Sequence, residues 1–308
     1  MRIAGFINRV LLLAVVTASL AAPGCATQQV SSETTALRIL LTNDDGYDAP
    51  GIQALRAALV AAGHDVILVA PLQDQSGSGA RVTTQGTLDY KEQSAGVWSV
   101  DGSPADSVLI GLLHIMGDES PDLVVSGANF GQNLGYAINS GTVGAATVAM
   151  YVGIPAIAVS VGVDLSERDA EPAPFPSTLQ AFAGAAELSV KLIGDLQKAP
   201  TDKGDLLPEH TLLNINYPAA APEQIRGIRV LQAARTSGVQ IDYEETGVSG
   251  QLEIRIRGMT PAVTDSDDTD WHLFARGFVT ISVLDGDWDA GESWRDALSS
   301  RLSMVGQP

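Results

Sequence analysis

The chain has 308 residues, of which 45% are hydrophobic, so it can bury the core of one large domain, alone or with a substantial appendage. This composition argues against a disordered protein or a membrane bundle. The formal net charge of −18 argues against binding of a nucleic-acid polymer, which depends on Lys and Arg. A small anionic substrate would therefore need a bound cation, a helix N-terminus, or both.

The first 24 residues have the features of a signal peptide. A basic start is followed by the apolar run 10–22, which is too short to span a bilayer as a mature helix and ends in small residues. The only cysteine follows in Ala22-Pro23-Gly24-Cys25, which resembles the cleavage box of bacterial lipoproteins, where the cysteine is lipidated. Ala22 stands where Leu is usual, so ordinary signal cleavage is the alternative.

We therefore expect an exported bacterial protein, either periplasmic or anchored to a membrane through a lipid on Cys25. Any membrane contact would be made through that anchor. Residues 25–36 are polar for most of their length and are expected to form a flexible tether.

Short apolar runs alternate with longer segments of helical period from residue 37 onwards, which is typical of βαβ units and a parallel sheet. Strands are expected at 38–42, 66–70, 122–126 and 156–161, and helices at 50–62, 103–116, 141–151 and 177–196. In the helix at 50–62, for example, Ile52, Leu55, Leu59 and Val60 recur at helical spacing. The prediction is a Rossmann-like, doubly wound, mostly parallel α/β core over residues 37–200.

The pattern changes after residue 200. Strand-like segments are no longer separated by long helices; they lie at 212–216, 228–231, 252–256 and 279–284. Residues 201–308 are expected to complete the core, to add a β-hairpin extension and to end in a short helix near residues 294–302. Ser177 is expected to cap the Ala-rich helix that precedes this region.

Three of the predicted strands are followed by loops rich in side-chain oxygens: Asn43-Asp44-Asp45-Gly46, Gln75-Ser76-Gly77-Ser78-Gly79 and Ser126-Gly127-Ala128-Asn129. The carboxyl ends of parallel strands form the ligand crevice of an open α/β sheet. Two adjacent carboxylates repel each other unless a cation lies close, and hard oxygen ligands suit Mg²⁺ or Mn²⁺. An isolated Asn-Asp-Asp-Gly would more often be a plain turn, but the three converging loops favour a metal site.

A phosphate site is predicted beside these loops. Ser140-Gly141-Thr142 begins the helix expected at 141–151, and the exposed amides and positive dipole end of a helix N-terminus bind phosphate. Ser140 can act as a plain N-cap at the same time. Asn133 lies a few residues before this helix.

Motifs of several other hydrolases and nucleotide-binding proteins are missing from the sequence. No Gly-x-Ser-x-Gly turn joins a strand to a helix, and no Walker A sequence or Gly-x-Gly-x-x-Gly follows the first strand. Asp285-Gly286-Asp287 resembles the start of an aspartyl-phosphate hydrolase motif. Asp289, however, stands where Thr or Val is needed, so a surface turn is favoured. The four histidines show no metal-ligand spacing.

Five further motifs follow one another along the chain: ILLTNDDGYDAPGI at 39–52, VAPLQDQSG at 69–77, DGSPADSV at 101–108, PDLVVSGANFGQNLG at 121–135 and SGTVGAAT at 140–147. In this order they closely resemble the SurE family of survival-protein nucleotidases and acid phosphatases. A weaker resemblance continues through LNINYP at 213–218 and DTDWHLFARGFVTISVL at 268–284. It covers nearly all of the chain after the tether.

The resemblance implies a phosphatase that uses one divalent ion, Mg²⁺ or Mn²⁺, to hydrolyse nucleoside 5′- and 3′-monophosphates. It also implies a homodimer or homotetramer formed through the C-terminal extension. The implied metal ligands are Asp44, Asp45, Ser76 and Asn129, with the two aspartates as catalytic residues, and the implied phosphate contacts are Asn133, Ser140, Gly141 and Thr142. Whether water or an aspartate attacks the phosphorus stays open.

Two departures from the family pattern bear on substrate preference more than on the reaction. The loop that reads SGASNS in typical bacterial members is SGSGAR at residues 76–81, so Ala80 replaces an asparagine. The loop between Gly135 and Ser140 is one residue shorter, and Asn139 stands where Tyr is usual. The alternative function from another class is a lipid-anchored protein that binds a metal and an anion without turnover.

Overall fold

The computed structural model describes residues 35–135, 137–235, 239–259, 268–286, 291–299 and 301. The predicted signal peptide, Cys25 and all but the last two residues of the tether lie outside these ranges, so export and lipidation stay predictions. Asp287 and Asp289 of the rival acidic motif lie outside them as well. Within the described ranges, no helix combines the length and the apolar character that crossing a membrane requires.

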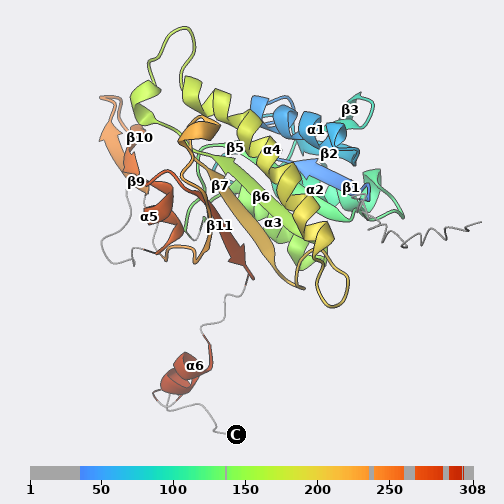
Figure 1. Ribbon diagram of the computed structural model, residues 1–308. Helices are drawn as coiled ribbons and strands as arrows, with labels where there is room; N and C mark the ends of the chain where they lie inside the picture. Colours follow the sequence, from blue (N-terminus) through green and yellow to red (C-terminus); the bar gives the residue numbers. More distant parts are fainter. Residues whose placement is uncertain are drawn as a thin grey trace, which may run out of the picture. The chain divides into compact units, whose positions relative to one another are not determined.

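The central feature is a mixed sheet to which nine of the described strands contribute, in the order β3-β4-β2-β1-β5-β6-β7-β11-β8 (Figure 1). Parallel pairing runs continuously from β4 through β7, and antiparallel pairs join β3 to β4 and β11 to β7. The bounds are β1 Arg38–Thr42, β2 Asp65–Pro71, β3 Tyr90–Ser94, β4 Val97–Val100, β5 Leu123–Phe130, β6 Ala156–Val161, β7 Leu212–Tyr217, β8 Ile228–Leu231 and β11 Val279–Leu284. The predicted doubly wound α/β fold is confirmed.

Helices cover both faces of this sheet (Figure 1). α1 (Pro50–Ala61) and α4 (Pro176–Lys198) pack on one face, where β1 contributes Ile39 and Leu41 to the core. α2 (Pro104–Ile110), its π-helical continuation η1 (Gly111–Ile115) and α3 (Gly141–Tyr151) pack on the other face, where β1 contributes Leu40. β1 is therefore buried on both sides, as its unbroken apolar sequence predicts.

The chain order reverses at β1, which has β2 on one side and β5 on the other. In an open α/β sheet, the carboxyl ends of strands at such a switch point form a crevice that binds ligands. The fold therefore places residues 43–46 and the end of β5 where a ligand site is expected.

Several predicted boundaries are confirmed and others are wrong. The strands at 38–42, 156–161, 228–231 and 279–284 and the helix at 141–151 match the structure. Ser177 does not cap α4, because Phe175 occupies the N-cap position, while Ser177 donates from its amide and its hydroxyl to Glu167 Oε2. Val60, one of the apolar residues that marked the helical spacing of 50–62, is 49% exposed, whereas Ile52, Leu55 and Leu59 are buried.

The end of β5 also differs from the prediction. The sequence predicted a loop at 126–129, whereas the strand continues to Phe130. Its pairing with β6 shifts register between Ser126 and Asn129, which is an irregularity of the β-bulge type. The glycine and polar residues that suggested a loop lie inside the strand at this irregularity.

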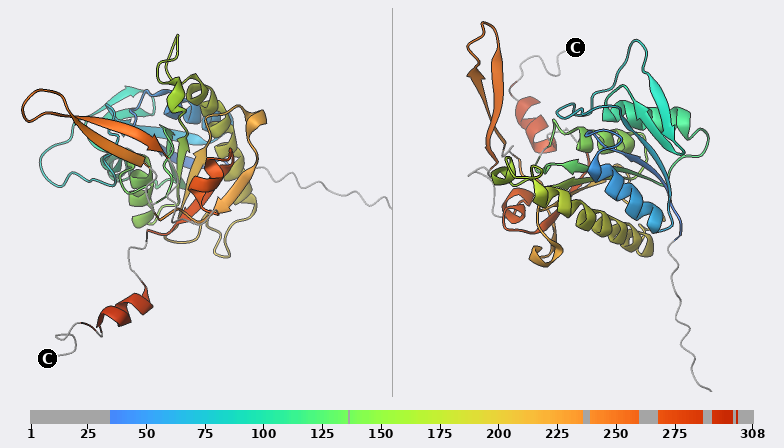
Figure 2. Two further views of the ribbon diagram at one scale, coloured as in Figure 1. Left: turned by 90° about the vertical axis from the view of Figure 1, so that its left-hand side faces the viewer. Right: turned by 90° about the horizontal axis from the view of Figure 1, so that it is seen from above.

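The predicted hairpin extension is present as a separate two-stranded antiparallel ribbon of β9 (Val239–Glu245) and β10 (Leu252–Met259) (Figure 2). β7, β8 and β11, which also come after residue 200, complete the main sheet instead. Two short helices, α5 (Asp270–Phe274) and α6 (Glu292–Ser299), precede and follow β11 in the chain.

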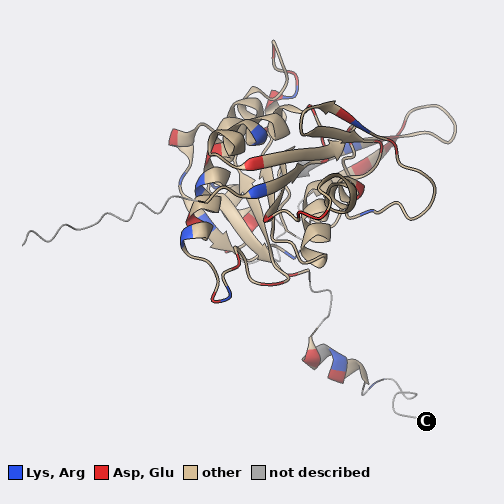
Figure 3. Cartoon of the chain, turned by 90° about the vertical axis from the view of Figure 1, so that its right-hand side faces the viewer, with Lys and Arg blue, Asp and Glu red and all other residues tan. Residues whose placement is uncertain are grey.

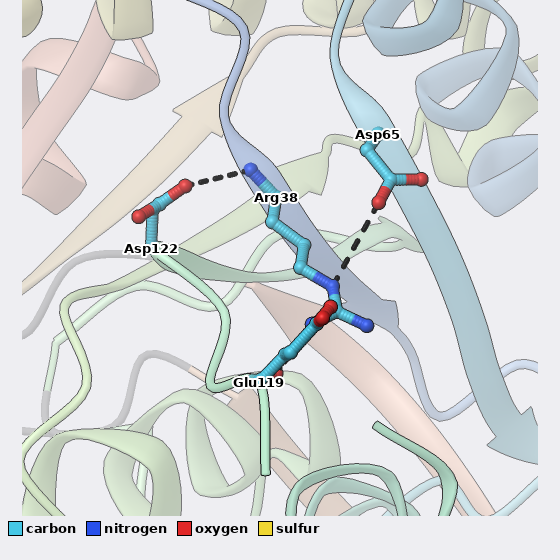
Figure 4. A network of polar contacts seen from close by, with 4 residues as sticks. All are labelled: Arg38, Asp65, Glu119 and Asp122. Atoms are coloured by element: carbon cyan, nitrogen blue, oxygen red, sulfur yellow. Dashed lines mark hydrogen bonds and ion pairs between the residues drawn. The ribbon is translucent and has the colours of Figure 1, made fainter. Parts of the chain in front are cut away.

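Arg38 connects the starts of three neighbouring strands at the end of β1 opposite to Asp44 (Figure 4). Its backbone amide donates to Asp122 Oδ2 at 2.7 Å, and its Nη1 donates to the carbonyl oxygen of Glu119 at 2.7 Å. Its Nε lies 3.7 Å from Asp65 Oδ2 on β2. These contacts support the register that brings the carboxyl ends of β1, β2 and β5 together.

Gly51 marks a close approach between α1 and β5. A Cβ at this position would lie 1.9 Å from the carbonyl oxygen of Ala128 and 2.8 Å from Phe182 Cε1. Gly51→Ala is therefore expected to lower the free energy of unfolding by about 3 kcal/mol, measured by denaturant titration, because a strand backbone must move. Ala57→Ser, at an exposed position of the same helix, should change it by less than about 0.5 kcal/mol. Equal stability of the two variants would contradict the close approach.

Candidate active site

Asp44 and Asp45 follow the last residue of β1, and both neighbouring strands reach them. The amide of Gln75, in the loop after β2, donates to the carbonyl oxygen of Asp44 at 2.8 Å. The amide of Phe130, the last residue of β5, donates to Asp45 Oδ2 at 2.9 Å. The structure thus brings the segments that carry the predicted ligands together at the carboxyl ends of β2, β1 and β5.

The N-terminus of α3 contacts Asp44 directly. Thr142 Oγ1 donates to Asp44 Oδ1 at 2.6 Å. A Cβ at Gly141 would lie 2.7 Å from Asp44 Cβ and 2.8 Å from Asp44 Oδ2, so this close approach requires glycine. Ser140 Oγ accepts from the amide of Val143 at 3.0 Å and is the N-cap of α3. The predicted phosphate-binding helix end therefore lies beside the predicted metal-binding carboxylate.

Asn133 joins the same hydrogen-bonded group through its side chain. Its Nδ2 donates to Ser160 Oγ at 2.9 Å and lies 3.4 Å from Thr142 Oγ1. A chain of hydrogen bonds therefore runs from Asn133 through Thr142 to Asp44. It connects the loop after β5, the start of α3 and the end of β1.

The backbone of Asn133 is held by two buried asparagines of β7 that the sequence analysis did not single out. Asn216 Oδ1 accepts from the Asn133 amide at 2.7 Å. The Asn133 carbonyl oxygen accepts from Asn214 Nδ2 at 2.7 Å and from Asn216 Nδ2 at 3.1 Å. The available signal was the motif LNINYP, in which two amides interrupt an otherwise apolar strand.

Ser76 and Asn129 lie on the segments that reach the aspartates, and the hydrogen bonds described for them go to other groups. Ser76 is exposed and follows Gln75, and its amide donates to Asp74 Oδ1 at 2.8 Å. Asn129 is 8% exposed, and its Nδ2 donates to the carbonyl oxygen of Gly131 at 2.7 Å. Their roles as metal ligands stay predictions.

Burial and mutual repulsion make the carboxylate pair unfavourable when both groups are charged. Burial raises the pKa of Asp44, and the hydrogen bond from Thr142 opposes that shift. Burial, followed by the charge of Asp44, raises the pKa of Asp45 to about 7, against the hydrogen bond from Phe130. Asp74, which the sequence analysis did not predict, raises the pKa of both groups further. A cation beside the pair would reverse this effect.

The donor groups around the pair fit a small, hard cation. Several buried oxygens here have no hydrogen-bond partner among the described residues: Asn43 Oδ1, Thr42 Oγ1, Ser78 Oγ and Ser126 Oγ. Carboxylate, amide and hydroxyl oxygens are ligands that Mg²⁺ and Mn²⁺ prefer. The described chain has no group of three or more His, Cys, Asp or Glu side chains that could hold a metal, so neutral oxygens would have to complete the coordination.

Comparison with known proteins agrees with this geometry. The family model described as survival protein SurE matches residues 39–239. The chain belongs to the SurE family. It is 38% identical over 250 residues to a protein of Geobacter sulfurreducens named 5′-nucleotidase SurE, covering 80% of this chain and 87% of that one.

Other SurE proteins also match over more than 80% of this chain. One of Nitratidesulfovibrio vulgaris, also named 5′-nucleotidase SurE, is 37% identical over 263 residues, covering 83% of this chain and 96% of the relative. The crystal structure of the SurE protein from Aquifex aeolicus matches with a TM-score of 0.69 at 30% identity, covering 86% of this chain and all of that one. The core, the site segments and the region after residue 200 thus share one family fold.

The raised pKa of Asp45 predicts how the stability of metal-free protein depends on pH. A carboxyl whose pKa rises from 3.8 to about 7 on folding favours the folded state at low pH, and this contribution is lost as the pH rises towards 7. Asp45→Asn removes the ionisable group and keeps an oxygen for the Phe130 amide. We expect this variant in EDTA at pH 8 to have a free energy of unfolding about 1–3 kcal/mol above that of the parent chain, and at pH 4 about the same.

Denaturant titrations at both pH values would test this expectation. Asp48→Asn, at an exposed position of the same loop, is the matched control and should show no such pH-dependent gain. A parent chain and an Asp45→Asn variant of equal stability at pH 8 would show that Asp45 is not destabilised by its surroundings.

Proposed function

We propose that this SurE protein is a divalent-metal-dependent phosphatase that hydrolyses nucleoside 5′-monophosphates, and 3′-monophosphates as well. The observation that carries the proposal is the hydrogen-bonded junction of Asp44, Thr142 and Asn133 at the N-terminus of α3. It joins a carboxylate pair, of which Asp44 is buried and Asp45 half-buried, to a helix end suited to an anion. The names of the relatives from Geobacter and Nitratidesulfovibrio support the nucleotide substrate.

Asp44, Asp45, Ser76 and Asn129 would hold the cation. When bound, such a cation polarises a phosphoryl oxygen and neutralises negative charge that develops during phosphoryl transfer. Mg²⁺ and Mn²⁺ both suit this set of oxygens.

The residues of the chain would bind and orient the phosphate and move a proton. Thr142 and Gly141 bring the positive end of the α3 dipole to the phosphate. The hydrogen bond from Thr142 fixes Asp44 Oδ1 and orients the carboxylate, with Oδ2 facing Gly141. An aspartate carboxylate can then accept a proton from an attacking water, or attack the phosphorus itself. In the first route the bond from phosphorus to the ester oxygen breaks, and the protonated aspartate returns its proton to the nucleoside oxygen. In the second route the same bond breaks as an aspartyl phosphate forms, and the nucleoside oxygen takes a proton from water. The hydroxide left from that water then hydrolyses the aspartyl phosphate to inorganic phosphate and the free carboxylate.

The charge distribution agrees with a small substrate rather than a polymer. Lys and Arg are interspersed with Asp and Glu over the described elements (Figure 3). With a net charge of −18, attraction of an anionic substrate depends on the local field of the helix end and the cation.

A phosphate-release assay on AMP and GMP tests the activity. We expect release with Mn²⁺ or Mg²⁺ and none in EDTA. Asp45→Asn should lower kcat by about a thousandfold or more, because it removes a carboxylate that both the cation and the reaction need. Asp48→Asn is the control and should keep full activity. Full activity of Asp45→Asn would contradict the site, whereas phosphate binding without release would support the non-catalytic alternative.

We also propose that the β9–β10 hairpin assembles the protein into a homodimer or homotetramer. The register of the hairpin puts five apolar side chains on one face, and all of them are 42–68% exposed: Ile241, Tyr243, Leu252, Ile254 and Ile256. The opposite face carries charged residues such as Arg255, which lies 3.1 Å from Glu244 Oε2. A two-stranded hairpin is marginally stable alone. The β9–β10 hairpin would gain stability if a second copy of the chain covered its apolar face.

Size-exclusion chromatography with light scattering tests this assembly. We expect an oligomeric parent chain and a monomeric Ile254→Asp variant, because a buried unpaired charge is unfavourable in an apolar interface. Leu113→Asp, at a position that is 79% exposed on η1, is the control and should leave the oligomer intact. A monomeric parent chain, or an Ile254→Asp variant of unchanged mass, would refute the role of the hairpin.

A further inference from the structure

Ser78 has a buried hydroxyl that the proposed function does not use. It lies in the loop after β2, two residues beyond the predicted ligand Ser76. Its Oγ is buried, and no group among the described residues hydrogen-bonds to it. A buried hydroxyl without a partner is unfavourable, so a group bound at this place would gain a contact at little cost.

The position of this hydroxyl can be fixed relative to Asp44 through Gly141. A Cβ built on Gly141 would lie 2.8 Å from Ser78 Oγ and also 2.8 Å from Asp44 Oδ2. The two oxygens are therefore at most 5.6 Å apart, the sum of these distances, and both lie beside the first residue of α3. One ligand held at the N-terminus of α3 can contact both the hydroxyl and the groups around Asp44.

The loop that carries Ser78 is held closely against α3. The amide of Gly79 donates to the carbonyl oxygen of Asn139 at 3.2 Å. A Cβ at Gly144 would lie 2.3 Å from the carbonyl oxygen of Gly79 and 2.6 Å from the amide nitrogen of Ala80. These close approaches fix the backbone on the C-terminal side of Ser78 and with it the place of the hydroxyl.

The neighbouring position cannot carry the hydroxyl instead. Gly79 has φ +57°, and a Cβ there would lie 2.9 Å from the carbonyl oxygen of Ile138. The SGASNS loop of typical members has alanine and then serine at the positions of Ser78 and Gly79. The Ile138 oxygen lies two residues before Ser140, the N-cap of α3. A serine side chain at position 79 would clash with this oxygen. In this chain the serine of the loop is at position 78 instead.

We infer that Ser78 donates a hydrogen bond to the phosphate group of the substrate at the N-terminus of α3. The inference rests on the proposed phosphatase function and adds a phosphate contact at a position where the SGASNS pattern has alanine. The hydroxyl donates its proton to an anionic oxygen, and the α3 dipole favours negative charge at the same place.

Calorimetric titration of the Mn²⁺-loaded protein with inorganic phosphate tests the contact without turnover. Ser78→Ala is expected to raise the dissociation constant for phosphate about tenfold, as the loss of one hydrogen bond to a charged group predicts. Ser78→Thr keeps the hydroxyl and should stay within about threefold of the parent chain. Ser94→Ala, the same change at an exposed position at the end of β3, is the control and should leave the constant unchanged.

A phosphate dissociation constant of Ser78→Ala within about twofold of the parent value would overturn the inference, and so would an equal loss in Ser78→Thr. The double variant Ser78→Ala/Gly79→Ser restores the typical order of residues and is expected to bind phosphate no better than Ser78→Ala. Recovery in the double variant would refute the steric reason given for Ser78.

These outcomes are separable from failure of the proposed function. A parent chain that binds phosphate but releases none from AMP would refute the nucleotidase proposal and leave Ser78 as a phosphate contact. Normal hydrolysis by Ser78→Ala, together with unchanged phosphate affinity, would refute the contact alone. A parent chain that binds no phosphate would refute the Ser78 contact, and the AMP assay would then decide the nucleotidase proposal on its own.

Discussion

The rest of the structure depends on two adjacent carboxylates just beyond the end of β1, of which Asp44 is buried and Asp45 half-buried. Each charge is unfavourable in that position, and burial with the neighbouring charge raises the pKa of Asp45 to about 7. The fold offsets part of this effect with the Phe130 amide, the Thr142 hydroxyl and the nearby end of α3. The arrangement is unfavourable without a ligand and suited to a cation and a phosphate, which is typical of a site organised in advance for its reaction.

The strands and helices that could be predicted from the sequence are those marked by nearby residues, through apolar periodicity or a helix cap. β1 and β6 consist mainly of apolar residues that are buried on both faces, and α3 starts at a serine that caps it. Asp44 was predicted as a site residue because it lies two residues beyond the end of a predicted strand. β3 was missed because all five of its side chains are exposed and polar or amphipathic, so no alternation marks it. The strand character of residues 127–129 was hidden by a glycine at an irregularity in the pairing of β5.

The parts of the site that were missed depend on contacts between distant segments. Asn214 and Asn216 hold the Asn133 backbone across about eighty residues, and the spacing within one motif cannot show that partnership. The family motifs indicated Ser76, whereas the closeness of Ser78 to Asp44 follows from a glycine on α3 that approaches both residues. Such relations follow from strand order and helix placement, which fix distances that are not encoded in any one motif.

Because Asn214 and Asn216 of β7 hold the backbone of Asn133, the candidate active site depends on two distant parts of the chain. Every predicted ligand and phosphate contact lies before residue 143, yet the backbone of Asn133 is held by a strand that is synthesised some eighty residues later. The first two hundred residues therefore contain all of the proposed chemistry without the support that orders it. During synthesis the Asn133 backbone gains these hydrogen bonds only after β7 has joined the sheet.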